Sequence, residues 1–159
     1  MVLDNDGMTA NSDLGLFVIR AGGTMFALSA KIGERLRIIY CGPDLEGSSA
    51  DELLELSHQD HAPGGPEEPI RSSWLNCVGT GHTSPPGLLM HAGGKHWCLD
   101  RLVSSAEIRG SSCIIHSVDQ QSQVKLYHTL QIDQLSGVAR LNTKIVNGGL
   151  RDFSLEWCS

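Results

Sequence analysis

Two histidines and an aspartate occur within four residues at His58-Gln-Asp-His61, a grouping that could supply ligands to a metal ion. If this segment were helical, the two histidines would lie on one face. However, the spacing matches no specific metal-binding signature, and the neighbouring prolines indicate a solvated loop. His91 and His96 flank Gly93-Gly94, a pattern that a turn between strands explains equally well. We therefore expect neither a metal site nor any other cofactor.

The motifs of common catalytic sites are incomplete or missing. Residues 79–84 resemble the start of a dinucleotide fingerprint, but the third glycine is absent and Pro85-Pro86 prevents the helix that should follow. The sequence contains no G-x-S-x-G elbow and no C-x-x-C pair. Glycosidases need two carboxyl groups at a defined separation, whereas adjacent acids such as Glu67-Glu68 are usually solvated. We therefore expect no catalytic residue within this chain.

Aromatic residues are scarce, which draws attention to Trp74, just after a long polar loop. An exposed indole at this position could stack its flat apolar face on a sugar ring. The alternative is that Trp74 pins the loop onto the body of the domain. Trp97 and Trp157 lie in strand-like surroundings, which predicts a place in the core or at an interface.

Composition excludes several classes of protein. The 159 residues are typical of one soluble domain, and the net charge of −6 without a lysine or arginine cluster argues against nucleic acid and against an anionic membrane. The N-terminus shows no secretory signal, and no apolar run reaches the roughly 20 residues that span a bilayer. The five cysteines are scattered, as expected for reduced thiols in a cytoplasmic protein.

The elements that must position these residues read as short strands between glycine-rich turns. We expect a flexible polar tail over residues 1–14, followed by strands near residues 16–19, 25–28 and 36–40. Residues 51–56 could form a helical turn or two with Ser49 as the cap. The polar stretch that follows, with three prolines and two glycines, is a long loop.

The last third of the sequence carries the clearest strand signal. Apolar residues alternate with polar ones over residues 124–132 and again over residues 139–145, with a hairpin turn at residues 133–137. Asn147-Gly-Gly149 permits a second turn, and residues 153–157 form a last alternating strand. The sequence therefore predicts an all-β fold, an antiparallel β-sandwich over residues 15–159 with one short helix or two in the loops.

From about Gly15 onward, a series of short stretches follow one another along the chain: Thr24–Leu28, Tyr40–Leu45, Pro86–Leu88, His91–Trp97, Leu126–Asp133, Ser136–Val138, Ile145–Gly149 and Phe153–Leu155. Their order and spacing resemble the N-terminal domain of glycoside hydrolase family 36, the α-galactosidase or melibiase family. Trp74-Leu-Asn-Cys-Val-Gly79 departs from the pattern, because many members have a Glu-Tyr-containing segment there.

The resemblance implies a β-supersandwich that packs against a catalytic (β/α)₈ barrel absent from this chain. In such enzymes two catalytic aspartates, the nucleophile and the acid/base of a retaining mechanism, lie in the barrel. It thus implies a non-catalytic accessory domain that supports the barrel, contributes to a possible homo-oligomer and borders the site for α-galactoside sugars. Trp74 and Asp60 are the candidates for that rim. Two alternatives remain open: a stand-alone carbohydrate-binding β-sandwich and a small metalloenzyme of jelly-roll type.

Overall fold

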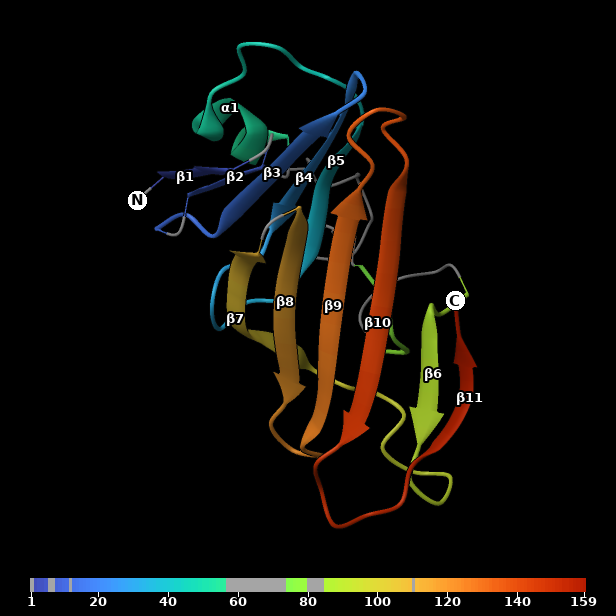
Figure 1. The fold of residues 1–159 in the computed structure, drawn as a ribbon. Coiled ribbons are helices and arrows are strands. Elements are labelled where there is room, and N and C mark those ends of the chain that lie inside the picture. Colours follow the sequence, from blue (N-terminus) through green and yellow to red (C-terminus); the bar gives the residue numbers. More distant parts are fainter. Residues whose placement is uncertain (1, 6–7, 12, 57–73, 80–84, 110) are drawn as a thin grey trace, which may run out of the picture.

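The computed structural model describes residues 2–5, 8–11, 13–56, 74–79, 85–109 and 111–159. These residues form three antiparallel sheets and one short helix, α1 (Ala50–Glu55) (Figure 1). The prediction of an all-β sandwich with a short helix is confirmed.

In spatial order, the five-stranded sheet contains β1 (Val2–Asn5), β2 (Met8–Asn11), β3 (Leu16–Ala21), β4 (Thr24–Ser29) and β5 (Arg37–Pro43). The four-stranded sheet contains β10 (Ala139–Asn147), β9 (Val124–Ile132), β8 (Ser112–Asp119) and β7 (Arg101–Arg109), and the two-stranded sheet contains β11 (Ser154–Cys158) and β6 (Leu88–His91).

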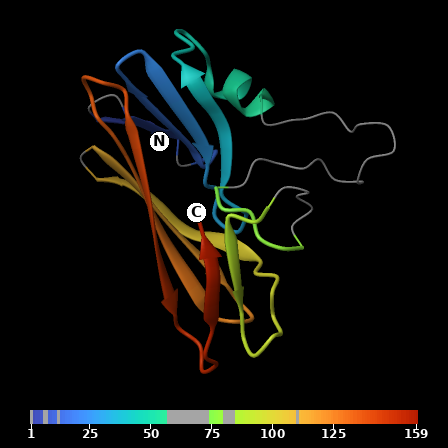
Figure 2. The same cartoon turned by 90° about the vertical axis from the view of Figure 1, so that its right-hand side faces the viewer.

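The four-stranded sheet is the common layer of the sandwich. One cluster of buried side chains joins it to the five-stranded sheet, through residues such as Ile19 and Ile115. A second cluster joins it to the two-stranded sheet, through residues such as Leu126 and Met90. The five-stranded and two-stranded sheets therefore cover different halves of the same inner face (Figures 1 and 2).

Strand β3 is buried on both faces, which explains its continuous apolar sequence. Because side chains alternate along a strand, Phe17 and Ile19 enter the core between the sheets, while Leu16 and Val18 point to the opposite face. There they pack with Leu53 of α1, which is 2% exposed.

The N-terminus of α1 is held by the cap that the sequence predicts. The backbone N–H of Glu52 donates to Ser49 Oγ at 3.2 Å, and the backbone N–H of Ser49 donates to Glu52 Oε2 at 2.7 Å. This reciprocal capping box satisfies two of the N–H groups that a helix start leaves without partners. It fixes the helix that places Leu53 over the sheet.

Residues 2–5 and 8–11, which the sequence suggests are part of a flexible tail over residues 1–14, form two strands in this structure. Strand β1 pairs with β2, and β2 pairs with β3, with Met8 opposite Ile19. Met8 is fully buried and Ala10 is 5% exposed. The short polar stretches around these residues give no local strand signal. The strand is stabilised by pairing with residues distant in the sequence and by burial.

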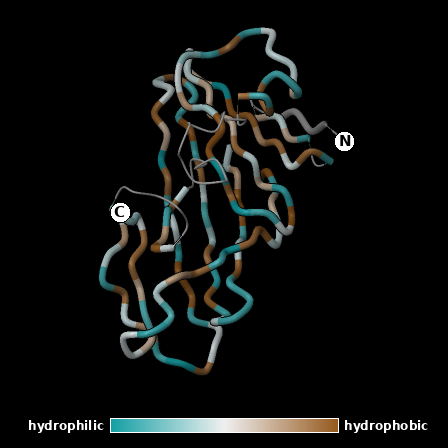
Figure 3. Tube along the Cα trace, turned by 180° about the vertical axis from the view of Figure 1, so that it is seen from behind, coloured by the Kyte–Doolittle hydropathy of each residue, from teal (hydrophilic) through white to brown (hydrophobic). Residues whose placement is uncertain are grey.

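The predicted hairpin from β9 to β10 is present, and hydrophobic and hydrophilic positions alternate along the strands (Figure 3). Its turn packs against the β3–β4 turn, where Gly22 has φ of 55° and any Cβ would collide with the backbone of Gly137. The expected final strand is present as β11, but Trp157 is 58% exposed and Trp97 is 37% exposed, so neither is a core residue. A place at an interface stays a prediction for both. A β-bulge at Glu156 shifts the register between β11 and β6.

Candidate functional site

Trp74, the first candidate for a sugar-site rim, lies where the two core clusters meet. It is half-buried and packs against both clusters. Its ring lies 5.5 Å from that of His128, with a tilt of 50° between the planes. The second candidate, Asp60, lies outside the described residues, as do His58 and His61. The structure therefore gives Trp74 a packing role, and its role at a sugar-site rim stays a prediction.

His128 is a deeply buried ionisable side chain beside Trp74, at 2% exposure. It comes from the middle of β9 and meets a hydroxyl from the strand on each side. Its Nε2 lies 3.2 Å from Ser117 Oγ on β8, and its Nδ1 lies 3.0 Å from Thr143 Oγ1 on β10. A neutral imidazole offers one donor and one acceptor, and a hydroxyl can serve either, so both ring nitrogens are satisfied.

Burial lowers the pKa of His128 to about 3, and the nearby positive charge of Arg101 adds to the effect. The imidazole is therefore neutral at physiological pH. A group with so low a pKa cannot exchange protons with a substrate near pH 7. His128 serves to tie three strands together beneath Trp74. The alternation on β9 places position 128 on the core face between Leu126 and Leu130, and that register could have identified it from the sequence.

Arg101 begins β7 and connects it to the segment that carries Trp74. Its Nη2 donates to the backbone carbonyl of Leu75, while its Nε is buried with no hydrogen-bond partner among the described residues. Burial lowers the pKa of the guanidinium, although it stays charged at any physiological pH. Nearby, the Asp119 carboxylate accepts the backbone N–H groups of Asp100 at 2.9 Å and of Ser122 at 2.7 Å. These polar contacts fix loops against the sheet.

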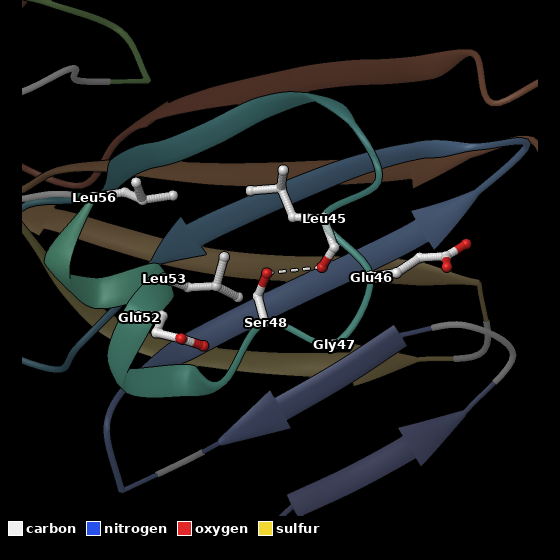
Figure 4. Close-up of a pocket in the computed structure, with 7 residues that line it drawn as sticks. All are labelled: Leu45, Glu46, Gly47, Ser48, Glu52, Leu53 and Leu56. Carbon is white, nitrogen blue, oxygen red and sulfur yellow. Dashed lines mark hydrogen bonds between the residues drawn. The ribbon is translucent and has the colours of Figure 1, made fainter.

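A shallow hollow opens beside α1, on the outer side of the five-stranded sheet (Figure 4). Two of its polar side chains are already used locally, because Ser48 Oγ donates to the carbonyl of Leu45 at 2.8 Å and Glu52 completes the helix cap. The hollow therefore presents no converging set of catalytic groups. The residues that line it are Leu45, Glu46, Gly47, Ser48, Glu52, Leu53 and Leu56.

His91 ends β6, directly before the turn that the sequence predicts at Gly93-Gly94. Its Nδ1 accepts the backbone N–H of Gly94 at 3.0 Å, and its Nε2 lies 3.1 Å from Glu156 Oε1. The centroid of the Trp97 ring lies 4.2 Å from that of the imidazole, and Trp97 donates its Nε1–H to the Gly94 carbonyl. These contacts define the turn. Among the residues that the structure describes, no three His, Cys, Asp or Glu side chains gather as metal ligands would.

Comparison with known proteins supplies an independent line of evidence. Residues 34–159 match the family model described as the glycosyl hydrolase family 36 N-terminal domain. A direct sequence comparison with curated proteins finds no match. No helix in the described part of the chain has the length and hydrophobicity needed to cross a membrane.

Several solved structures share the fold. The galactosidase domain of the α-galactosidase–sucrose kinase AgaSK superposes with a TM-score of 0.80 at 16% identity, covering 95% of this chain and 24% of that one. The α-galactosidase of Lactobacillus brevis gives 0.78 at 12% identity, over 94% and 24% of the two chains. The α-galactosidase AgaB of Geobacillus stearothermophilus gives 0.71 at 13% identity, over 95% and 24%. This chain thus has the fold of about a quarter of each of these proteins.

Proposed function

The chain belongs to the glycosyl hydrolase family 36 N-terminal domain family, and we propose from this that it is a non-catalytic accessory domain of a retaining α-galactosidase. In this proposal the domain supports the catalytic barrel of the longer enzyme, contributes to contacts between copies of that enzyme and borders its sugar site. The observation that carries the proposal is the combination of the family match with the fold match. The fold covers 94–95% of this chain but only 24% of each of three α-galactosidases.

Three of the described carboxylates have structural partners, which supports a non-catalytic role. Asp44 pairs with Arg20 at 3.0 Å, and Asp100 pairs with Arg35 at 2.7 Å. Asp119 holds two backbone N–H groups. A retaining glycosidase instead needs two carboxyl groups about 5 Å apart across a sugar-binding cleft.

The proposal is tested by comparing the purified chain with the protein encoded by the complete gene, using an aryl α-galactoside as substrate. We expect the longer protein to release the aryl group and the chain alone to release none above the uncatalysed rate. Turnover by the chain alone would overturn the non-catalytic assignment. A longer protein that is folded but inactive on α-galactosides would overturn the assignment to an α-galactosidase.

The rim role of Trp74 needs a separate experiment, because its packing against His128 also predicts a loss of stability on substitution. Trp74→Phe keeps an aromatic ring in the core and is compared with Trp74→Ala in the longer enzyme. If Trp74 borders the sugar, we expect Trp74→Phe to raise the KM for raffinose while the thermal midpoint stays near that of wild type. Unchanged kinetics with a lowered midpoint would leave Trp74 with a packing role alone.

Calorimetry on the chain alone separates an accessory domain from a stand-alone carbohydrate-binding module. We expect no heat of binding with galactose or raffinose, because a rim completed by a barrel offers few contacts by itself. Saturable binding would favour the stand-alone module.

We also propose that the enzyme works in the cytoplasm, and the five free cysteines support this assignment, since a reducing compartment keeps thiols unpaired.

A further inference from the structure

The strands β10 and β11 are the outer strands of their sheets, and they lie on the same side of the molecule (Figures 1 and 2). Among the described residues β10 pairs with β9 alone, and β11 pairs with β6 alone. An unpaired edge presents a row of backbone N–H and C=O groups that another strand can bind. At nine residues, β10 is as long as any strand in the described structure.

The register of β10 shows which of its side chains face the core. Residues directly opposite each other in an antiparallel pair share a face of the sheet. Leu141 lies opposite Leu130, which is 1% exposed, yet Leu141 itself is 46% exposed. Ile145 lies opposite the fully buried Leu126 but is only half-buried. The core-facing side of β10 is therefore partly uncovered.

Strand β11 has the same mismatch. Leu155 lies opposite Met90, which is 4% exposed, yet Leu155 is 55% exposed. Cys158 lies opposite Leu88, which is 1% exposed, and is itself exposed. Both outer strands thus direct apolar side chains toward the interior of the sandwich at a place where the described residues do not cover them.

This surface continues the existing core. Ile145 and Phe153 pack against the second core cluster, and Ala139 packs against the first. The opposite face of β10 is polar, because Arg140, Asn142 and Lys144 are exposed there. We name the uncovered core margin the β10–β11 seam, and it consists of Ala139, Leu141, Ile145, Leu155 and Cys158.

We propose that the β10–β11 seam receives an amphipathic β-strand from the part of the α-galactosidase that lies outside this chain. This inference rests on the proposed function, because the matched α-galactosidases are about four times as long as the part that this chain covers. The strand extends the backbone ladder of β10 and places apolar side chains over Leu141 and Leu155. Its other face carries acidic or polar side chains opposite Arg140 and Lys144, since opposite charges on neighbouring strands attract.

Hydrogen exchange on wild-type protein tests the proposal without any substitution. In the chain alone, the β10 amides that point away from β9 should exchange quickly, because they have no partner strand among the described residues. In the complete enzyme we expect these same amides to exchange at least about tenfold more slowly. Equal exchange in the two proteins would overturn the proposal. Protection that appears in the chain alone and grows with concentration would also overturn it, because a second copy would then occupy the seam.

A matched pair of variants locates the docked face. Leu141→Lys places a charge on the seam, whereas Asn142→Lys places the same charge on the polar face of the same strand. In the complete enzyme we expect the first substitution to lower the thermal midpoint and the second to leave it unchanged, while neither alters the chain alone by a comparable amount. Equal midpoints for the two enzyme variants would contradict docking at this seam. A complete enzyme that is inactive on α-galactosides but has slowly exchanging β10 amides would refute the proposed function. It would still support the binding of a strand at the seam.

Discussion

Protonation of His128 should make the stability of this domain depend on pH. The imidazole is buried and neutral, with a pKa of about 3, against an ordinary value of 6.5. Between these two values the unfolded chain binds a proton at His128 and the folded chain does not. Acidification below pH 6.5 therefore favours the unfolded state, and the full stability contributed by His128 is present only above that pH.

The size of the effect follows from linkage. Below pH 6.5 the free energy of unfolding falls by about 1.4 kcal/mol for each pH unit, until the folded-state pKa is reached. Between pH 7.5 and pH 5 the loss from this one group amounts to about 2 kcal/mol. His128→Asn removes the titrating group, so the variant should lose about 2 kcal/mol less than wild type over the same interval.

Urea unfolding of both proteins at pH 7.5 and pH 5 measures this difference. His96→Asn is the matched control, because His96 is exposed and has φ of 59°, a conformation that asparagine tolerates. The control should keep the wild-type pH dependence. Equal slopes for wild type and His128→Asn would refute the reasoning. A direct check is the NMR signal of the His128 ring in wild type, which should keep its neutral shift down to pH 5.

Three further predictions concern the cap, the turns and the thiols. Ser49→Ala removes the side-chain acceptor of the α1 cap and should lower the free energy of unfolding by about 1 kcal/mol, as measured by urea titration. Gly22→Ala should lower the thermal midpoint more than Gly33→Ala, because both glycines have positive φ but only at Gly22 does a Cβ meet backbone. Burial raises the pKa of Cys113 to about 12, so Cys113 and the buried Cys77 should react with a thiol reagent only after unfolding. The thiols expected to react in the native protein are those of Cys41, Cys98 and Cys158.

The parts of the fold that the sequence predicts are those with a strong local signal. Strand β9 has one buried and one wet face, so its alternation is clear. Strand β3 is apolar throughout because α1 covers its second face. Strand β7 has no such signal, since its core-facing pattern is shifted by a bulge between Val103 and Ser105. Strand β2 is short, and it is stabilised by pairing with β3 and by the burial of Met8 in the first core cluster.

The surroundings of Trp74 could be predicted only in part, for a related reason. The position of Trp74 after a long polar loop drew attention to it, but nothing local indicates that its ring meets His128. That contact depends on two core clusters meeting, and the partners of His128 come from two different neighbouring strands. A site built from residues of three strands has no fixed spacing along the sequence, so no sequence motif identifies it. A buried histidine inside an apolar alternation is the one local sign that such a site leaves.

At the edge of the sandwich, the burial of apolar residues differs from what their alternation along the strands predicts. Leu130 and Leu141 face each other across β9 and β10, on the same face, and the alternation predicts the same burial for both. The structure buries the first and leaves the second 46% exposed. By contrast, every apolar side chain of β3 is buried, on both faces of the sheet. Apolar alternation is typical of a strand whose apolar face is covered, so the exposed apolar side chains of β10 and β11 are the basis of the proposed strand at the β10–β11 seam.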